Sequence, residues 1–383
     1  MISKRVKKLA PSGIRAFFDL VMGMPEVISL GVGEPDFISP WRVREKAITA
    51  LEEGMTSYTS NQGLFVLRRD IANHYKRRFS LSYDPKTEIL ITVGVSEALD
   101  LALRAILEPK DKVIVVTPHY VAYPALVEIS GGQVLYLTTK AEDNFKIDIK
   151  RLKELLKANP KAIILNNPSN PTGTHYTSLE LKKIWKVIAN KKTLVISDEV
   201  YDELIYDQKH SPFASLSKEA KKRTILLNGF SKGYAMTGFR VGYACASQEI
   251  IAAMSKIHSF SIMCVPTISQ VAASEALLSQ KEVIAMRSAY RRRRELVVKE
   301  LNRLGLTTNL PQGAFYCFPS LEKFKIDSLS FAKKLLFEQK VAVVPGVAFG
   351  KELSSYIRIS YANSLDNLKE AIIRIEKFLG KLK

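Results

Sequence analysis

NGFSKGYAMTGFR, residues 228–240, is the stretch around which the rest of this chain is organised. It follows the apolar run TILL (224–227), which has the length of a buried strand. Lys232 therefore lies just beyond a strand, where α/β sheets bind their ligands. A lysine amine loses its proton readily when it is desolvated or placed near another cation, and it then becomes a nucleophile. Arg240 lies eight positions later, and its planar guanidinium, which can donate two parallel hydrogen bonds, can reach the same pocket. The alternative for both residues is that they are solvated surface charges, as most lysines and arginines are.

Residues 88–246 alternate between apolar runs and helical patterns. Helical spacing is clear in 96–107, 147–158 and 178–189. Near-continuous apolar strands that alternate with helices predict a mainly parallel sheet covered on both faces, so the fold class is α/β. The runs expected to be strands are 89–93, 113–117, 133–137, 162–165, 193–197, 224–227 and 241–246.

The pattern changes beyond residue 283. A long helical stretch (281–304) leads into a smaller region of mixed helices and strands. At 383 residues the chain is long enough for two cores. We predict an N-terminal arm that also contributes to a small domain (1–45), a large domain (46–283) and a small α+β C-terminal domain (284–383).

Several polar or aromatic residues follow the predicted strands. Ser96 and Glu97 open a helix whose free amides favour an anion, although such residues also simply cap helices. Tyr120 is ordinarily a packing residue, and Asn170 in Asn-Pro-Thr-Gly is ordinarily a turn residue. Asp198 ends an apolar strand, where an unpaired carboxylate is costly to bury.

The net charge is +19, with 57 Lys and Arg against 38 Asp and Glu. A basic surface suits nucleic acid, anionic membranes or acidic metabolites. The basic residues are scattered, however, and the densest runs, 4–8 and 291–294, lack interleaved aromatics. The second run is expected to form a solvated helix face. We therefore predict no nucleic-acid partner.

The three cysteines, Cys245, Cys264 and Cys317, are widely spaced and flanked by apolar residues. They are expected to be reduced, buried thiols in a reducing compartment and not a disulfide framework. No metal site is predicted. The basic N-terminus lacks an apolar segment behind it, and no apolar run approaches the roughly 20 residues that span a bilayer. We predict a cytoplasmic protein without a membrane partner.

SKGYAMTGFRVGY (231–243) resembles the Schiff-base motif of the class I/II aminotransferases, fold-type I enzymes that depend on pyridoxal 5′-phosphate (PLP). The resemblance extends from about residue 12 to the C-terminus. PSGIR (11–15) and GFR resemble the prokaryotic-type subgroup of aspartate and aromatic aminotransferases. The motifs that agree in order are GEPDF (33–37), SYTSNQG (57–63), NPTG (170–173), SDEVY (197–201) with SK…GFR, and YIRIS (356–360).

The resemblance implies which residues hold the cofactor. Lys232 would carry it covalently, and Tyr120 would stack on its ring. Asp198 would face a protonated ring nitrogen, and Tyr201 would donate to the phenolate oxygen. The residues implied for the cofactor phosphate are Arg240, Ser231, the segment Val95, Ser96 and Glu97, and Tyr58 from the other subunit.

The resemblance also implies the substrate contacts. Arg358 would hold the substrate α-carboxylate through two parallel hydrogen bonds, assisted by Asn170 and the backbone of Gly33. If Tyr58 reaches across to a partner, the enzyme is a homodimer with a shared active site. Gly229 departs from branches that carry a phosphate-binding serine there, so that contact passes to Ser231.

The expected activity is ping-pong transfer of an amino group from an L-amino acid to 2-oxoglutarate. Catalysis would rest on Lys232, Asp198 and Tyr201. Aspartate is the first expected donor, because the basic character favours a dicarboxylate, and aromatic amino acids are the second. Two alternatives remain open: a PLP-dependent C–S lyase acting by β-elimination, and a non-catalytic nucleic-acid-binding regulator of the same fold.

Overall fold

Seven strands form the central sheet of the protein, whose computed structural model describes residues 2–3, 6–7, 9 and 23–382. The strand order is β2-β8-β7-β6-β5-β3-β4. All strands run parallel except β8, which is antiparallel to both neighbours. The bounds are β2 Ile89–Thr92, β3 Lys112–Thr117, β4 Gln133–Thr138, β5 Ala162–Asn166, β6 Leu194–Asp198, β7 Thr224–Gly229 and β8 Gly242–Cys245.

Each of the seven predicted apolar runs forms one of these strands, which confirms a mainly parallel α/β sheet. The runs lack polar alternation because both sheet faces are covered. On β7, for example, Leu226 packs into one hydrophobic cluster while Ile225 and Leu227 pack into another on the opposite face. The order of the strands and the reversal of β8 were not part of the prediction.

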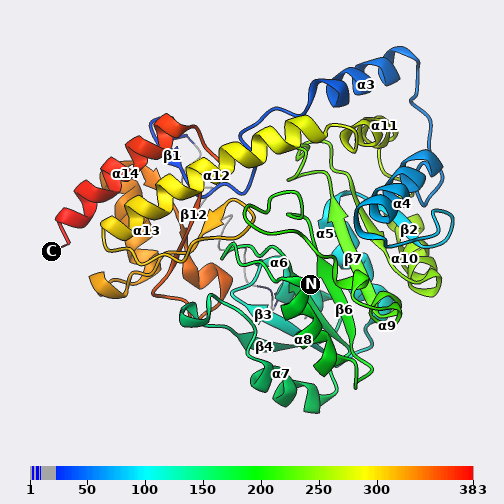
Figure 1. The fold of residues 1–383 in the computed structure, drawn as a ribbon, viewed down its shortest axis with the longest axis horizontal. Helices are drawn as coiled ribbons and strands as arrows, with labels where there is room; N and C mark the ends of the chain where they lie inside the picture. Colours follow the sequence, from blue (N-terminus) through cyan, green and yellow to red (C-terminus); the bar gives the residue numbers. More distant parts are fainter. Residues whose placement is uncertain (1, 4–5, 8, 10–22, 383) are drawn as a thin grey trace.

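Helices cover both faces of the sheet (Figure 1). Buried residues of α5, α6 and α10 pack on one face, and those of α4, α11, α7 and α8 pack on the other. A capping box fixes the start of α8, because Thr177 and Glu180 each bond the other's backbone amide. The bounds are α3 Trp41–Glu52, α4 Phe65–Phe79, α5 Gly94–Ile106, α6 Ala122–Ile129, α7 Ile149–Leu155, α8 Ser178–Ile188, α9 Lys218–Lys222, α10 Gln248–Ser261 and α11 Thr267–Ala276.

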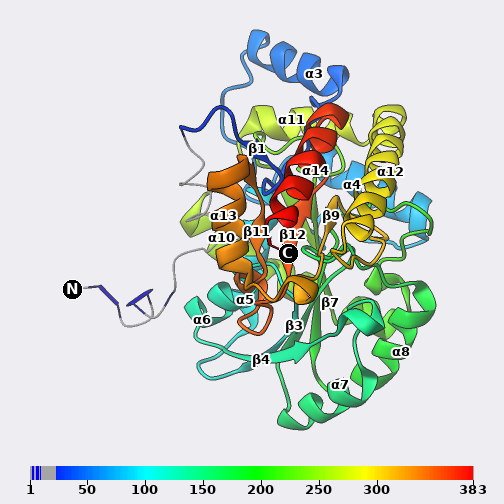
Figure 2. The ribbon, with the colours of Figure 1, turned by 90° about the vertical axis from the view of Figure 1, so that its left-hand side faces the viewer.

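The C-terminal part builds a second core. Strands β11 (Val344–Pro345), β12 (Ile357–Ser360) and β9 (Tyr316–Cys317) form a small antiparallel sheet, in that order. Strand β1 (Ile28–Ser29) crosses from the N-terminal part to pair with β10 (Val341–Ala342). Helices α13 and α14 lie beside one another over this region (Figure 2). The remaining bounds are α12 Gln280–Arg303, α13 Ser328–Gln339 and α14 Leu365–Gly380, with short 3₁₀ turns at Ala141–Asp143, Leu156–Ala158, Phe213–Ser215, Glu322–Phe324 and Gly346–Phe349.

Helix α12 connects the two cores (Figure 1). Val283 packs with residues of α4 and α11, whereas Met286, one turn later, packs in the C-terminal core. Helix α12 thus passes from one hydrophobic core to the other near the predicted boundary at residue 283, although the helix itself is continuous. The three-part division of the chain stays a prediction.

Three sequence expectations need correction or fall outside the described residues. The run 291–294 is not a uniformly solvated face: Arg293 and Arg294 are buried, with ion pairs to Asp36 and Asp207. Cys245 and Cys317 are buried free thiols, but Cys264 is only half-buried. The PSGIR stretch and most of the run 4–8 lie outside the described residues.

Across the part of the chain that the structure describes, no helix combines the length and apolar character that crossing a bilayer requires.

Candidate active site

Lys232 lies in a cavity of about 320 Å³ at the carboxyl ends of β5, β6 and β7. Its Nζ donates a hydrogen bond of 2.6 Å to the carbonyl oxygen of Gly33. Eleven of the thirteen predicted site residues line this cavity, and Glu97 and Tyr58 do not. The eleven are Gly33, Val95, Ser96, Tyr120, Asn170, Asp198, Tyr201, Ser231, Lys232, Arg240 and Arg358.

Burial lowers the pKa of Lys232 to about 8. The carboxylate of Glu34 opposes this shift, while the positive charges of Arg240 and Arg358 add to it. No carboxylate lies within ion-pair distance of Nζ among the described residues. About half of this amine is therefore neutral near pH 8, well below the pH at which an unperturbed lysine loses its proton, and a nucleophilic lysine requires the neutral form.

Asp198 is the last residue of β6 and is buried. Tyr123 donates a hydrogen bond of 2.7 Å to its Oδ2, and the amide of Val200 contacts Oδ1 at 3.3 Å. Burial nevertheless raises the pKa of Asp198 to about 6, against these two hydrogen bonds. This carboxylate faces the cavity without an ion-pair partner among the described residues, so a cationic ligand atom suits it.

Aromatic side chains shape the middle of the cavity. The hydroxyls of Tyr201 and Tyr316 lie 3.0 Å apart, and the rings of Tyr120 and Tyr123 meet edge to face. Tyr316 also explains why residue 33 is a glycine, because a Cβ there would lie 2.6 Å from the Tyr316 hydroxyl. A flat ligand ring fits among these faces.

One end of the cavity is built for an anion. Helix α5 begins there at Gly94, with Val95 and Ser96 in its first turn, so free amides and the positive end of the helix dipole are present. The guanidinium of Arg240 lies against this helix start, since a Cβ on Gly94 would meet its Nη2 at 2.6 Å. Within the described residues Arg240 bonds only the carbonyl of Thr237, at 3.1 Å, and no carboxylate.

Glycines bring this anion-binding end together. A Cβ on Gly242 would lie 2.5 Å from the carbonyl carbon of Gly94, so β8 can press against the start of α5 only without a side chain. A Cβ on Gly229 would lie 3.0 Å from the Cα of Gly242. Position 229 is a glycine where other branches of the family carry a serine, and this close backbone packing is consistent with the glycine. Ser231 is the serine that lines the cavity.

Arg358 and Asn170 form the other end. Arg358 is only 2% exposed; it donates to Asn170 Oδ1 at 2.9 Å and to the carbonyl of Gly31 at 2.6 Å. Its Nε has no hydrogen-bond partner and no carboxylate pairs with it within the described chain. Burial lowers the pKa of this guanidinium. A buried cation without a counter-ion is costly, and a ligand carboxylate would offset that cost.

Glu97 and Tyr58 lie outside the cavity. The carboxylate of Glu97 turns back to accept from the amide of Val93 and from His258 Nδ1 at 2.8 Å. Tyr58 is 82% exposed in a surface loop. The roles predicted for these two residues stay predictions, and that of Tyr58 requires a second chain.

Six lining residues were missed in the sequence, and the polar ones among them are Tyr123, Asn166 and Tyr316. Asn166 accepts from the amide of Asn170 at 2.7 Å and donates to the carbonyl of Asp198 at 3.0 Å, so it ties the ends of β5 and β6 together. Its place at the end of an apolar run was a usable signal. No sequence signal marks the two tyrosines as lining residues, because most buried tyrosines serve only packing.

Comparison with known proteins agrees with this geometry. The family model for aminotransferases of class I and II matches residues 25–375. The chain belongs to this family.

Its curated relatives are aminotransferases of nearly equal length. A putative aminotransferase of Bacillus subtilis, YugH, is 46% identical over 99% of this chain and 98% of its own. An aspartate aminotransferase of Pyrococcus abyssi is 42% identical over 100% and 99%.

Solved aminotransferase structures have the same fold. An aspartate aminotransferase from Thermus thermophilus with maleate superposes with a TM-score of 0.94 at 36% identity, covering 98% of this chain and 99% of the other. An aromatic aminotransferase from Pyrococcus horikoshii gives 0.91 at 40% identity, covering 97% and 100%. The protein is thus a fold-type I aminotransferase, as the sequence predicted.

Class I/II aminotransferases of this fold use PLP, and the cavity fits that cofactor. The unpaired Arg240 at the start of α5 suits a phosphate, and the buried carboxylate of Asp198 suits a protonated ring nitrogen. Lys232 lies in the same cavity with a lowered pKa, and Tyr120 offers a ring face. Bound PLP supplies an electron sink for the substrate carbanion.

Proposed function

We propose that this aminotransferase moves the amino group of aspartate to 2-oxoglutarate by a ping-pong mechanism, with aromatic amino acids as its second class of donor. The observation that carries the proposal is the arrangement of Arg358, Lys232 and Asp198 around one cavity. A cation without a counter-ion, a lysine of lowered pKa and a buried carboxylate serve substrate binding, proton transfer and cofactor activation respectively.

Arg358 holds the substrate α-carboxylate in this proposal. Its side chain is fixed by Asn170 and the carbonyl of Gly31, and its guanidinium lies over the ring of Tyr316 at 4.4 Å. Because the Arg358 guanidinium is already oriented by these contacts, little side-chain entropy is lost when the carboxylate binds. The substrate Cα is thereby held in one orientation, which is a positioning contribution to the rate.

Lys232 transfers the proton. Once its amine is free it takes the proton from the substrate Cα, and a pKa near 8 allows it to act both as base and as acid near neutral pH. Asp198 keeps the cofactor ring nitrogen protonated, and Tyr123 holds the Asp198 carboxylate in place. Tyr201, bonded to Tyr316, offers its hydroxyl to the cofactor oxygen.

A dicarboxylate donor is supported by charge and by similarity. The net charge of +19 favours the encounter with acidic metabolites. The Pyrococcus abyssi relative is named for aspartate, whereas the Pyrococcus horikoshii structure is named for aromatic substrates. The lyase and regulator alternatives gain no support from these names, because each describes an aminotransferase.

The decisive test is the visible absorbance of the purified PLP-loaded protein. We expect aspartate to change the cofactor band and 2-oxoglutarate to restore it, with a smaller or slower response to phenylalanine. Lys232→Ala should abolish the response, and Lys186→Ala, at an exposed site on α8, should keep it. A cofactor band that responds to neither amino acid would overturn the proposal, and sustained release of 2-oxo acid without an acceptor would indicate β-elimination instead.

We further propose that the enzyme is a cytoplasmic homodimer in which Tyr58 reaches the partner's cofactor phosphate. The support is the exposure of Tyr58, which lies outside the cavity of its own chain. We propose no nucleic-acid or membrane partner.

A further inference from the structure

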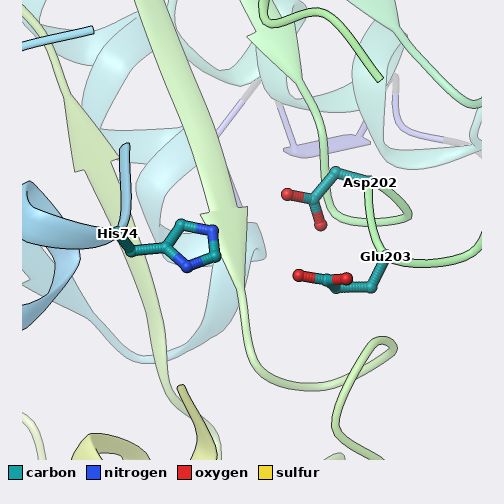
Figure 3. A group of neighbouring side chains, drawn as sticks. All are labelled: His74, Asp202 and Glu203. Carbon is teal, nitrogen blue, oxygen red and sulfur yellow. The ribbon is translucent and has the colours of Figure 1, made fainter. Parts of the chain in front are cut away.

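A second group of ligand-type side chains lies outside the active-site cavity. His74 comes from α4, and Asp202 and Glu203 come from the turn that follows Tyr201. Each offers one nitrogen or oxygen atom, and these atoms all lie within 4.8 Å of one another. Figure 3 shows the imidazole and both carboxylates facing the same space. All three residues are buried, and none lines the cavity that holds Lys232.

These facing atoms lack partners. Glu203 Oε2 has no hydrogen bond although the side chain is only 2% exposed. Among the described residues, no donor reaches the carboxylate of Asp202 and no partner reaches the ring nitrogens of His74. Acceptors that face one another in a buried space need a cation or donor between them.

The nearby charges leave room for a cation. Arg78, one turn beyond His74, pairs with Glu203 Oε1 and leaves Oε2 free, and its side chain is 31% exposed and so partly solvated. His210 and Glu199 pair with each other at 2.7 Å. No salt bridge joins Asp202 to a cation among the described residues, although Arg78 and His210 both act electrostatically on its carboxylate.

We propose that His74, Asp202 and Glu203 bind a divalent transition-metal ion of the Zn²⁺ type. One imidazole with two carboxylates is a donor set that such ions accept, with water completing the coordination. These ligands bind at roughly 2.0–2.2 Å, so small side-chain rotations bring all three atoms onto one ion. Asp202 and Glu203 supply two negative charges, of which that of Glu203 is shared with Arg78.

A bound ion would stabilise the segments that carry two of the active-site residues, Tyr201 and Lys232. Asp202 directly follows Tyr201, and Gly233, next to Lys232, packs so closely on Glu203 that a Cβ there would lie 2.8 Å from the Glu203 Cβ. Binding would tie α4 to the turn that carries Tyr201 and to the segment that carries Lys232. This site is independent of which amino acid the enzyme uses.

Calorimetric titration with Zn²⁺ alone tests the proposal, using the PLP-loaded full chain in chelator-treated buffer. A Cys264→Ser background removes the half-exposed thiol as a competing ligand. We expect one Zn²⁺ per protomer and a higher midpoint of thermal unfolding. Asp202→Asn and His74→Gln should each weaken binding by more than about tenfold. The control Glu142→Gln, at an exposed carboxylate, should leave it unchanged.

Anomalous diffraction at the zinc edge gives a second measurement that does not depend on how the variants fold. We expect a peak between His74, Asp202 and Glu203. Absence of Zn²⁺ binding, equal affinity in all variants, or a peak confined to other residues would overturn the proposal.

Discussion

Lys232, Asp198 and Arg358 are charged residues that line one cavity without an opposite charge in contact among the described residues, and Asp198 and Arg358 are buried while Lys232 is partly buried. Each would be costly in an ordinary core. Their pKa values shift accordingly: burial lowers those of Lys232 and Arg358 and raises that of Asp198. The unfavourable free energy of holding these charges without a counter-ion is offset when ligands of opposite charge bind in the cavity.

Replacing Arg358 by lysine should reduce kcat/KM for aspartate by roughly 10–100-fold. A lysine retains the charge but cannot form two parallel hydrogen bonds, and a hydrogen bond to a charged group contributes about 1.5–3 kcal/mol. Steady-state kinetics measure the effect. Arg374→Lys is the control and should behave like the wild type, because Arg374 pairs with Glu370 on α14 and does not line the cavity. An unchanged kcat/KM in Arg358→Lys would place the substrate carboxylate elsewhere.

The rate at which PLP attaches to the cofactor-free protein should rise with pH and level off above about pH 8. Below its pKa of about 8 the Lys232 amine is protonated and not nucleophilic, and above it the amine is neutral. Stopped-flow absorbance from pH 6 to 10 measures the rate. A rate still rising steeply at pH 10, where an unperturbed lysine titrates, would show that burial does not lower this pKa.

Helix α12 and the loop 31–37 show how elements far apart in sequence fix the substrate end. Asp36 in this loop accepts hydrogen bonds from Arg293 Nη1 at 2.7 Å and from the Tyr290 hydroxyl at 3.2 Å, both on α12. The Arg293 guanidinium also lies over the ring of Phe37 at 5.0 Å. The same loop presents the carbonyls that meet Lys232 and Arg358, so α12 supports both contacts indirectly.

Arg293→Gln should lower the free energy of unfolding by about 1.5–3 kcal/mol and raise KM more than it lowers kcat. It breaks a mostly buried charged hydrogen bond and leaves Asp36 without its cation. Urea denaturation and steady-state kinetics measure the two effects. The neighbouring Arg292→Gln is the matched control, because Arg292 is exposed and should change stability by no more than about 0.5 kcal/mol. Equal behaviour of the two variants would remove the assigned role of Arg293.

At the scale of the whole molecule, the loop that carries Tyr58 lies beside the connection between α10 and α11. The carbonyl of Ser57 accepts a hydrogen bond of 2.7 Å from Thr267, and Phe260, in the last turn of α10, is 92% exposed. Ile262 and Met263 are exposed in the same connection. Exposed apolar residues gathered beside a loop are typical of an interface with another chain, which supports the proposed homodimer.

Mixing two defective variants tests the shared site. Lys232→Ala and Tyr58→Ala proteins, each impaired alone, should regain activity when their subunits exchange. In a hybrid dimer one site then carries both substitutions and the other carries neither. Random exchange should restore about a quarter of the sites, and sedimentation should give a dimer. No gain above the two separate activities, despite exchange, would mean that Tyr58 does not act across the interface.

The family resemblance of the sequence motifs indicated most of the lining of the cavity, and the amino-acid sequence by itself determined the class of fold and the positions of the seven sheet strands. These depend on local patterns: an apolar run such as 224–227 is buried on both faces wherever it lies in the sheet, and a polar residue that ends it, such as Asp198, faces the ligand side. The motifs around Lys232 and Arg358 added the cofactor and the family, which the comparisons confirm.

Only the tertiary structure decided what depends on residues distant in the chain. Nothing local marks Tyr316 as the partner of Tyr201, or places His74 beside Asp202, which lies 128 positions later. Arg292 and Arg293 are adjacent and chemically identical, yet one is solvated and the other pairs with Asp36, because α12 turns only one of them toward the loop. Burial and partners are properties of the packed chain, and it is packing that turns a charged residue into either a surface group or part of a site.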